Sequence, residues 1–163
     1  MRNVVLLVGG LTALFLMAQT PPVAPQQPIP YSHKIHAGDQ KLACKFCHEN
    51  KDPGEIMGIP ETAKCMGCHT AIKKDSPHIA KLTEFHTQQR KVPWIRIYQI
   101  PSYVFFSHKA HVEAKNTCAD CHGPVAEREA LRKEVSTSMG TCMDCHRAKK
   151  APNDCTFCHE ARN

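Results

Sequence analysis

The chain has 163 residues and a formal net charge of +6, from 21 Lys and Arg against 15 Asp and Glu. This length fits a single domain, but only 6% of the residues are aromatic, which is little for a conventional apolar core. Basic residues are not interleaved with aromatic ones, as a nucleic-acid-binding surface requires, so nucleic acid is not an expected partner.

The first 20 residues have the pattern of a targeting segment. A short basic start containing Arg2 is followed by an apolar stretch over residues 4–18 and then by small residues. That stretch is shorter than the about 20 apolar residues that a membrane span needs, and it matches a secretory signal peptide. We therefore expect residues 1–20 to be a cleaved signal peptide of a periplasmic protein, with a retained membrane anchor as the alternative.

The next ten residues, 21–30, contain five prolines and no charged residue. Proline-rich segments of this kind adopt an extended, semi-rigid conformation rather than a helix or a strand. We expect a tether here, followed by a single folded domain over residues 31–163.

All ten cysteines of the chain fall in five Cys-x-x-Cys-His motifs. This pattern is the attachment signature of c-type haem: both thiols bond to the porphyrin, and the histidine ligates the iron on its proximal side. The expected covalent attachment residues are Cys44, Cys47, Cys65, Cys68, Cys118, Cys121, Cys142, Cys145, Cys155 and Cys158. The expected proximal ligands are His48, His69, His122, His146 and His159. The sequence therefore predicts five covalently bound haems c.

Structural zinc is the other common use of paired cysteines. A four-cysteine zinc site needs motifs in twos, and an odd number of pairs leaves one without a partner. Zinc also does not require a histidine directly after the second cysteine, and here all five pairs have one. The pattern therefore favours haem over zinc.

A six-residue pattern occurs twice, as YSHKIH at residues 31–36 and as FSHKAH at residues 106–111, each time ahead of a haem motif. Two histidines three residues apart on one helical turn point to neighbouring but different places, so each can ligate a separate iron. The expected distal ligands are therefore His33, His36, His108 and His111. The aromatic residue that opens each copy is expected to pack on a haem edge.

This repeat divides the domain into two modules. The first module, residues 31–69, contains two haem motifs, and the second, residues 106–159, contains three. A connector over residues 70–105 joins them. Within it, residues 92–101 are bracketed by prolines and are expected to be extended, with Trp94 against a haem or the module interface.

Five irons need five distal ligands, and the repeat supplies four. Met139 is our choice for the fifth, because thioether sulfur is a known axial ligand of haem. His78 and His86 are the alternatives, on a helix that Ser76 and Pro77 are expected to begin. Residues 126–135 are expected to form a charged helix.

The expected fold is mainly irregular loops with short α-helices wrapped around haems, and little or no β-sheet. Haem iron with two protein ligands exchanges electrons and has no free position for a substrate. We therefore expect an electron-transfer protein and not an enzyme. A small multihaem reductase with one open haem is the alternative.

Several stretches resemble known multihaem cytochromes of the c3 and c7 type, and more closely the pentahaem cytochrome subunit of alternative complex III and its short stand-alone relatives. They are residues 58–60, 65–69, 93–96, 103–111, 121–125 and 139–140. The resemblance implies bis-histidine haems in a close-packed wire. It also adds a quinol-oxidising membrane complex to the expected redox-protein partners. Members bound in such a complex are membrane-anchored, so membrane association through the N-terminal segment belongs with the alternative of a retained anchor. One departure is that residues 123–141 contain no histidine, whereas a c7-like module would take a distal ligand from there.

Overall fold

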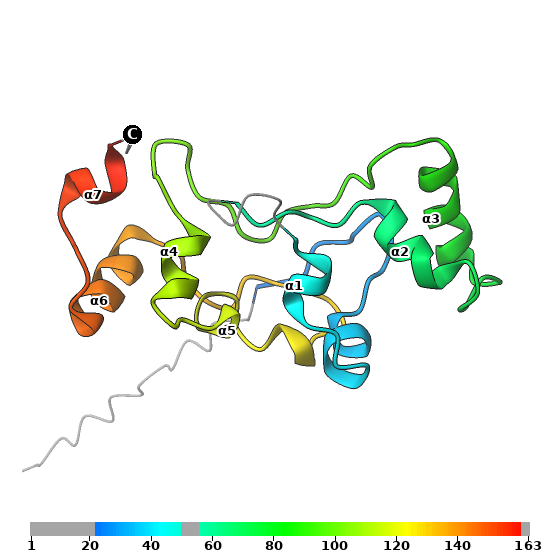
Figure 1. The fold of residues 1–163 in the computed structure, drawn as a ribbon, viewed down its shortest axis with the longest axis horizontal. Helices are drawn as coiled ribbons and strands as arrows, with labels where there is room; N and C mark the ends of the chain where they lie inside the picture. The colour runs from blue at the N-terminus through cyan, green and yellow to red at the C-terminus, as the bar shows by residue number, and fades with distance from the viewer. Residues whose placement is uncertain (1–21, 50–55, 161–163) are drawn as a thin grey trace, which may run out of the picture.

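A computed structural model describes residues 22–49 and 56–160. The molecule is elongated, with α2 and α3 at one end, α1 and α5 in the middle, and α6 and α7 at the other end (Figure 1). Short helices are joined by long irregular segments, and the described residues contain no β-strand. This arrangement confirms the fold class expected from the sequence.

Every Cys-x-x-Cys-His motif lies in or at the end of a short helix. These helices are α1 (Cys44–Cys47), α2 (Thr62–His69), α5 (Cys118–His122), α6 (Met139–Lys149) and α7 (Cys155–His159). Some have side-chain caps: the Ser138 hydroxyl accepts from the backbone N–H of Thr141 at the start of α6, and Thr117 forms a capping box with Asp120 at the start of α5. Helices this short are only marginally stable on their own, so attachment to a bound group would contribute much of their stability.

The two copies of the six-residue pattern also begin helical turns. In the first, η1 (Lys34–Asp39) is a π-helical turn that follows His33, and in the second, α4 (His108–Glu113) begins at the corresponding histidine. The serine before each first histidine caps its turn: Ser32 Oγ accepts from Ile35 N at 3.0 Å, and Ser107 Oγ accepts from Ala110 N at 3.1 Å. The two copies thus share the serine cap, although the turn that follows is π-helical in the first copy and α-helical in the second.

Helix α3 (Pro77–Thr87) begins where the sequence predicts, with Ser76 as N-cap and proline in the first turn. Its buried residues Leu82 and Phe85 pack with Met66 of α2 and form a small apolar core, which Ile29 and Val92 complete. Trp94 is partly buried against this core and lies edge-on to Tyr31, with ring centres 6.5 Å apart. Residues 92–100 contain no helix or strand, in agreement with the expected extended connector.

The proline-rich segment has no helix or strand over its described residues 22–30, but it is packed against the domain. Ile29 is only 6% exposed, and the Gln27 side chain forms two hydrogen bonds of 2.9 Å with the backbone of Ile95. The expected signal peptide, residues 1–20, lies outside the described residues. None of the helices in the part of the chain that the structure describes is both long and apolar enough to cross a membrane.

The expected helix over residues 126–135 is wrong. The structure has a single 3₁₀ turn, η2 (Val125–Glu127), followed by an irregular segment. The backbone N–H groups of Glu134 and Val135 donate to the Tyr98 hydroxyl, at 3.1 and 3.2 Å, rather than to carbonyls of their own segment. A tertiary contact from the connector therefore replaces the local hydrogen bonds that a helix would need.

Candidate haem-binding sites

We number the five motifs in chain order. Site 1 is Cys44, Cys47 and His48; site 2 is Cys65, Cys68 and His69; site 3 is Cys118, Cys121 and His122; site 4 is Cys142, Cys145 and His146; site 5 is Cys155, Cys158 and His159. All ten cysteines are free and at least partly exposed, so no disulfide competes with thioether formation. The described residues contain no group of three or more His, Cys, Asp or Glu that could hold a metal ion.

In the first module, two histidine rings face two motif histidines. The ring centres of His33 and His48 of site 1 are 6.4 Å apart, and the planes differ by 1°. The ring centres of His36 and His69 of site 2 are 6.1 Å apart, and the planes differ by 60°. One turn of the chain therefore supplies a facing ring to two attachment sites.

The second module repeats this arrangement. The rings of His108 and His122 of site 3 are 6.5 Å apart with planes 5° from parallel. The rings of His111 and His146 of site 4 are 5.9 Å apart with planes 48° from parallel. In both modules the first histidine of the pattern gives a near-parallel pair and the second gives a twisted pair.

These separations fit an iron held between two imidazoles. Two iron–nitrogen bonds of about 2 Å, with about 1.2 Å from each nitrogen to its ring centre, place the centres roughly 6.4 Å apart. The four observed values lie between 5.9 and 6.5 Å. The donor sets of sites 1 to 4 thus match six-coordinate haem.

Backbone carbonyls orient most of these rings. Because a carbonyl only accepts, the Nδ1 atom that it contacts must carry the proton, which leaves the Nε2 lone pair free for a metal. For the motif histidines the contacts are His48 to Gly58 O at 2.8 Å, His69 to Ile72 O at 3.0 Å, His146 to Pro152 O at 2.5 Å and His159 to Tyr103 O at 3.2 Å. For the repeat they are His36 to Ser32 O at 2.8 Å and His111 to Ser107 O at 2.7 Å.

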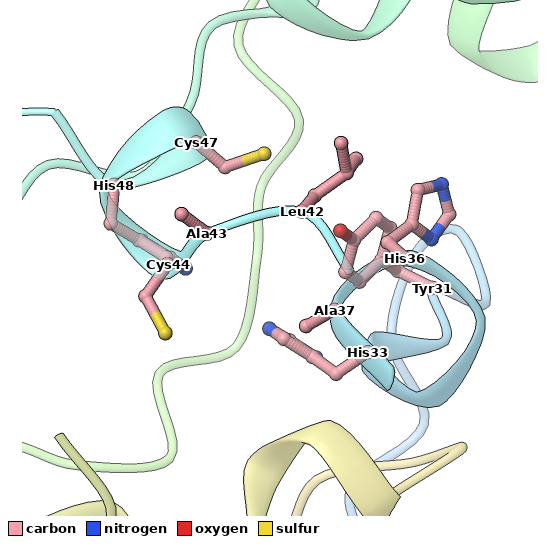
Figure 2. A pocket seen from close by; sticks show the side chains of 9 residues that line it. All are labelled: Tyr31, His33, His36, Ala37, Leu42, Ala43, Cys44, Cys47 and His48. Atoms are coloured by element: carbon pink, nitrogen blue, oxygen red, sulfur yellow. The ribbon is translucent and has the colours of Figure 1, made fainter. Parts of the chain in front are cut away.

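Figure 2 shows the hollow of site 1, lined by the site's two thiols and by Tyr31, His33 and Leu42 among others. Burial, reinforced by the nearby His48 and His36, lowers the pKa of His33 to about 4. The imidazole is therefore neutral at pH 7, which is the form that binds a metal. Its Nδ1 is buried without a hydrogen-bond partner in the described structure.

The aromatic residue of each repeat packs on its two histidines. Tyr31 stacks on His36 with ring centres 4.5 Å apart, and Phe106 stacks on His111 at 4.6 Å. Each also meets the first histidine edge-on at 4.8 Å. Burial is the main reason that the pKa of Tyr31 rises to about 12. Each aromatic ring is thus a wedge between the two imidazoles of its copy, and its contact with a haem edge stays a prediction.

Site 5 differs from the others, because no histidine of the described residues pairs with His159. The ring of Tyr103 lies near it instead, with centres 6.0 Å apart and planes 23° from parallel. Met139, our choice for the fifth distal ligand, is the first residue of α6 and is 68% exposed. It lies three residues before Cys142, hence on the same face of the helix.

The two alternative ligands lie on α3, at the other end of the molecule from site 5 (Figure 1). His78 is exposed, and His86 Nδ1 is 3.1 Å from the hydroxyl of Thr62, which links α3 to α2. Neither position brings an imidazole towards α7. His86 has a structural contact of its own, and this placement favours Met139 over both.

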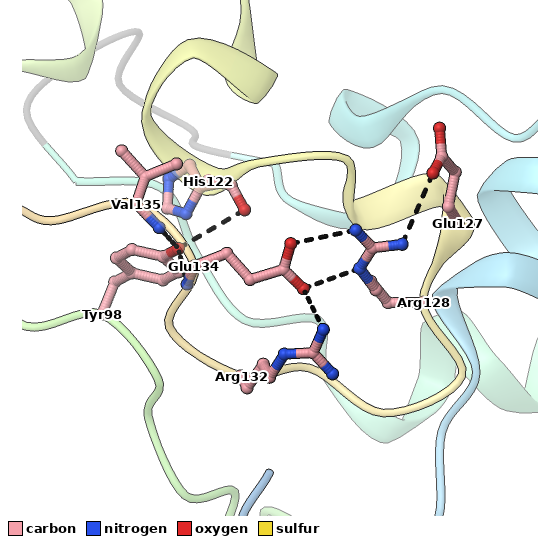
Figure 3. A network of polar contacts seen from close by, with 7 residues as sticks. All are labelled: Tyr98, His122, Glu127, Arg128, Arg132, Glu134 and Val135. Atoms are coloured by element: carbon pink, nitrogen blue, oxygen red, sulfur yellow. Dashed lines mark hydrogen bonds and ion pairs between the residues drawn. The ribbon is translucent and has the colours of Figure 1, made fainter. Parts of the chain in front are cut away.

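A polar network that the sequence did not reveal lies beside site 3 (Figure 3). The Tyr98 hydroxyl donates to the carbonyl of His122 at 3.4 Å. Two nitrogens of Arg128 donate to the Glu134 carboxylate, at 2.6 and 3.0 Å, and this contact lowers the pKa of Glu134. Arg128 and Glu134 are six residues apart on an irregular segment, so no helical spacing could have indicated the pair.

Two comparisons with known proteins bear on these sites. Residues 104–160, which include the whole second module, match the family model for cytochrome c7 and related cytochrome c. The chain is also similar to the multiheme cytochrome c subunit of menaquinone reductase from Nitratidesulfovibrio vulgaris, Hildenborough strain. The two are 37% identical over 162 aligned positions, which cover 83% of this chain and 77% of the relative.

Proposed function

Because the chain belongs to the small multihaem c-type cytochromes, which hold haem c covalently and transfer electrons, we propose that it carries five haems and works in a periplasmic respiratory chain. The observation that supports this most strongly is the set of four facing histidine pairs with centres 5.9 to 6.5 Å apart. A haem iron with two axial imidazoles exchanges single electrons without gaining or losing a ligand.

In this proposal the cysteines of sites 1 to 5 hold the porphyrins, and the motif histidines are the proximal ligands. The distal ligands are His33 at site 1, His36 at site 2, His108 at site 3 and His111 at site 4, and the four ring pairs support this assignment. Met139 is the distal ligand at site 5. A His/Met iron there would have the highest reduction potential of the five.

A quinone-linked membrane complex is the proposed partner. The similar protein from Nitratidesulfovibrio vulgaris is a subunit of a menaquinone reductase. Two directions of electron flow are then open, from a quinol into this chain or from this chain to a quinone. Purified complex mixed with a menaquinol analogue or with a menaquinone analogue distinguishes them, by reduction of the haems in the first case and oxidation in the second.

The haem number is tested on protein exported by a host that matures c-type cytochromes. Mass spectrometry and the pyridine haemochromogen assay should show five haems per chain. Export of the processed chain without haem would contradict the proposal.

A second candidate function, a reductase with one open haem, is favoured only by the missing histidine partner at site 5. Carbon monoxide added to the dithionite-reduced protein separates the two. An unchanged Soret band supports electron transfer alone, and binding of one equivalent supports an open iron. A Met139→Ala variant should bind one equivalent and lose one high-potential component in a redox titration, whereas His78→Ala should change neither.

A further inference from the structure

We propose that the five sites form one unbranched series in the order 2–1–3–4–5, so that the two modules meet through sites 1 and 3 and the ends are sites 2 and 5. This order rests on the proposed function, in which each site holds one haem. It differs from the order of the motifs along the chain, in which sites 2 and 3 would be neighbours.

Within each module, the repeat itself makes two sites adjacent. His33 faces site 1 and His36, three residues later, faces site 2. Tyr31 contacts both of these histidines and also lies close to Cys47 of site 1 and Cys65 of site 2. The chain cannot separate two sites whose facing ligands share one helical turn, so sites 1 and 2 are neighbours.

The second module gives the same result for sites 3 and 4. His108 and His111 face them, again from one turn. The thiol of Cys121 at site 3 lies near the thiols of Cys145 and Cys142 at site 4. Sites 3 and 4 are therefore neighbours as well.

The modules are joined at sites 1 and 3. The first thiols of the two motifs, Cys44 and Cys118, lie close to each other. The two motif histidines, His48 and His122, also lie near each other. In Figure 1, α1 and α5 lie side by side in the middle of the molecule, whereas α2 lies apart from α5 on the far side of α1.

Backbone contacts hold this junction. The turns η1 and η2 pack on each other, and the Lys34 N–H donates to the Arg128 carbonyl at 2.9 Å. Gly38 lies so close to Ala126 that an added Cβ would collide with the Ala126 carbonyl oxygen. The segment after site 3 is therefore fixed against the segment before site 1.

Site 5 extends the series beyond site 4. The thiol of Cys142 at site 4 lies near that of Cys158 at site 5. Helix α7 forms one end of the molecule, and α2 with α3 forms the opposite end (Figure 1). An electron entering at site 2 would therefore pass through every other site before it reached site 5, and loss of site 1, 3 or 4 would interrupt the path.

The order is tested on the mature holoprotein by raising the potential of one site and recording which others respond. His108→Met should raise the potential of site 3. Because a reduced haem carries one more negative charge, the haems next to it should then become harder to reduce. NMR of the haem methyl groups during a redox titration should show the largest changes at sites 1 and 4. The matched variant His36→Met, at an end of the series, should chiefly affect site 1.

Larger changes at site 2 than at site 1 in His108→Met would overturn the order. Should either variant fail to accumulate, the fully reduced wild-type protein gives the same answer, since its low-spin haems are diamagnetic. Nuclear Overhauser effects are expected between the haems of sites 1 and 3, and their absence there or presence between sites 2 and 3 would contradict the proposal. A protein with fewer than five haems would contradict the proposed function instead.

Discussion

The two modules hold their paired histidines alike but cover them differently. In each, a capped turn places one near-parallel and one twisted pair of rings, with an aromatic wedge between them. Beside the first module, α3 packs on α2, and every buried apolar side chain of the described residues lies between positions 29 and 92. The second module has a further attachment site instead. The comparison indicates that a six-residue pattern fixes the facing rings in both modules, whereas the apolar packing beside those rings differs between the modules.

Removal of the second histidine of either repeat should have the largest effect. In both modules it should open one iron to an added ligand. His36→Ala and His111→Ala should each leave one iron with a single axial ligand. Each reduced variant should then bind one equivalent of carbon monoxide more than the wild type. A variant that binds none would show that the facing ring is not a ligand at that site, and His78→Ala serves as the control.

The apolar core lies beside the first module only, so a substitution in it should lower the free energy of unfolding. Leu82 is 5% exposed, so Leu82→Ala should lower the free energy of unfolding by about 2–5 kcal/mol. Ile72, which is 56% exposed, is the control, and Ile72→Ala should change stability by less than about 0.5 kcal/mol. Thermal unfolding of the holoproteins measures both. Equal effects of the two variants would mean that the haems alone stabilise the first module.

The junction between the modules should be sensitive to a single methyl group. Gly38→Ala should destabilise the protein by about 1–3 kcal/mol, because η1 and η2 would have to separate. At Gly67 in α2 an added Cβ meets no atom within 4 Å, so Gly67→Ala should be neutral or stabilising by up to about 1 kcal/mol. An unaffected Gly38→Ala variant would show that the turns are not held in contact.

The polar network of Arg128 and Glu134 should make a smaller, pH-dependent contribution to the stability of the protein. Since Arg128 lowers the pKa of Glu134 in the folded protein, this pair stabilises above the ordinary Glu pKa, and the contribution is lost as the pH falls through the lowered value. Glu134→Gln should therefore reduce the melting temperature at neutral pH, and the difference from wild type should shrink on acidification. Glu127→Gln, at a more exposed partner of Arg128, should show little difference at any pH. A difference that is constant with pH would argue against the pair.

The smallest expected effect is a difference in the EPR spectra of the oxidised haems. Near-parallel axial imidazoles give rhombic low-spin ferric EPR spectra, and twisted ones give a larger maximum g value. The oxidised protein should therefore contain both classes, with sites 1 and 3 in the first and sites 2 and 4 in the second. His33→Ala should remove a rhombic signal and His36→Ala a large-g signal. The reverse assignment would contradict the ring angles.

Local patterns predicted the start of one helix and the turns that carry the facing histidines, whereas contacts between segments far apart in the chain could not be predicted. The start of α3 followed from Ser76 and Pro77, and the repeat indicated four of the facing rings because its ligands share one turn. The helix over residues 126–135 fails because the Glu134 N–H donates to Tyr98, 36 residues away in the chain. The pairing of Arg128 with Glu134 has no helical spacing that could have indicated it. Which ring faces which site also depends on how distant turns meet, and a linear pattern does not contain that information.

Six of the histidine rings donate from Nδ1 to the main chain and not to side chains. Their acceptors are main-chain oxygens of Ser32, Gly58, Ile72, Tyr103, Ser107 and Pro152. A substitution changes a side chain but leaves the peptide carbonyl in place, so mutational drift at these six positions would not delete the acceptor. Ring orientation would then survive extensive divergence, as long as the path of the chain is kept.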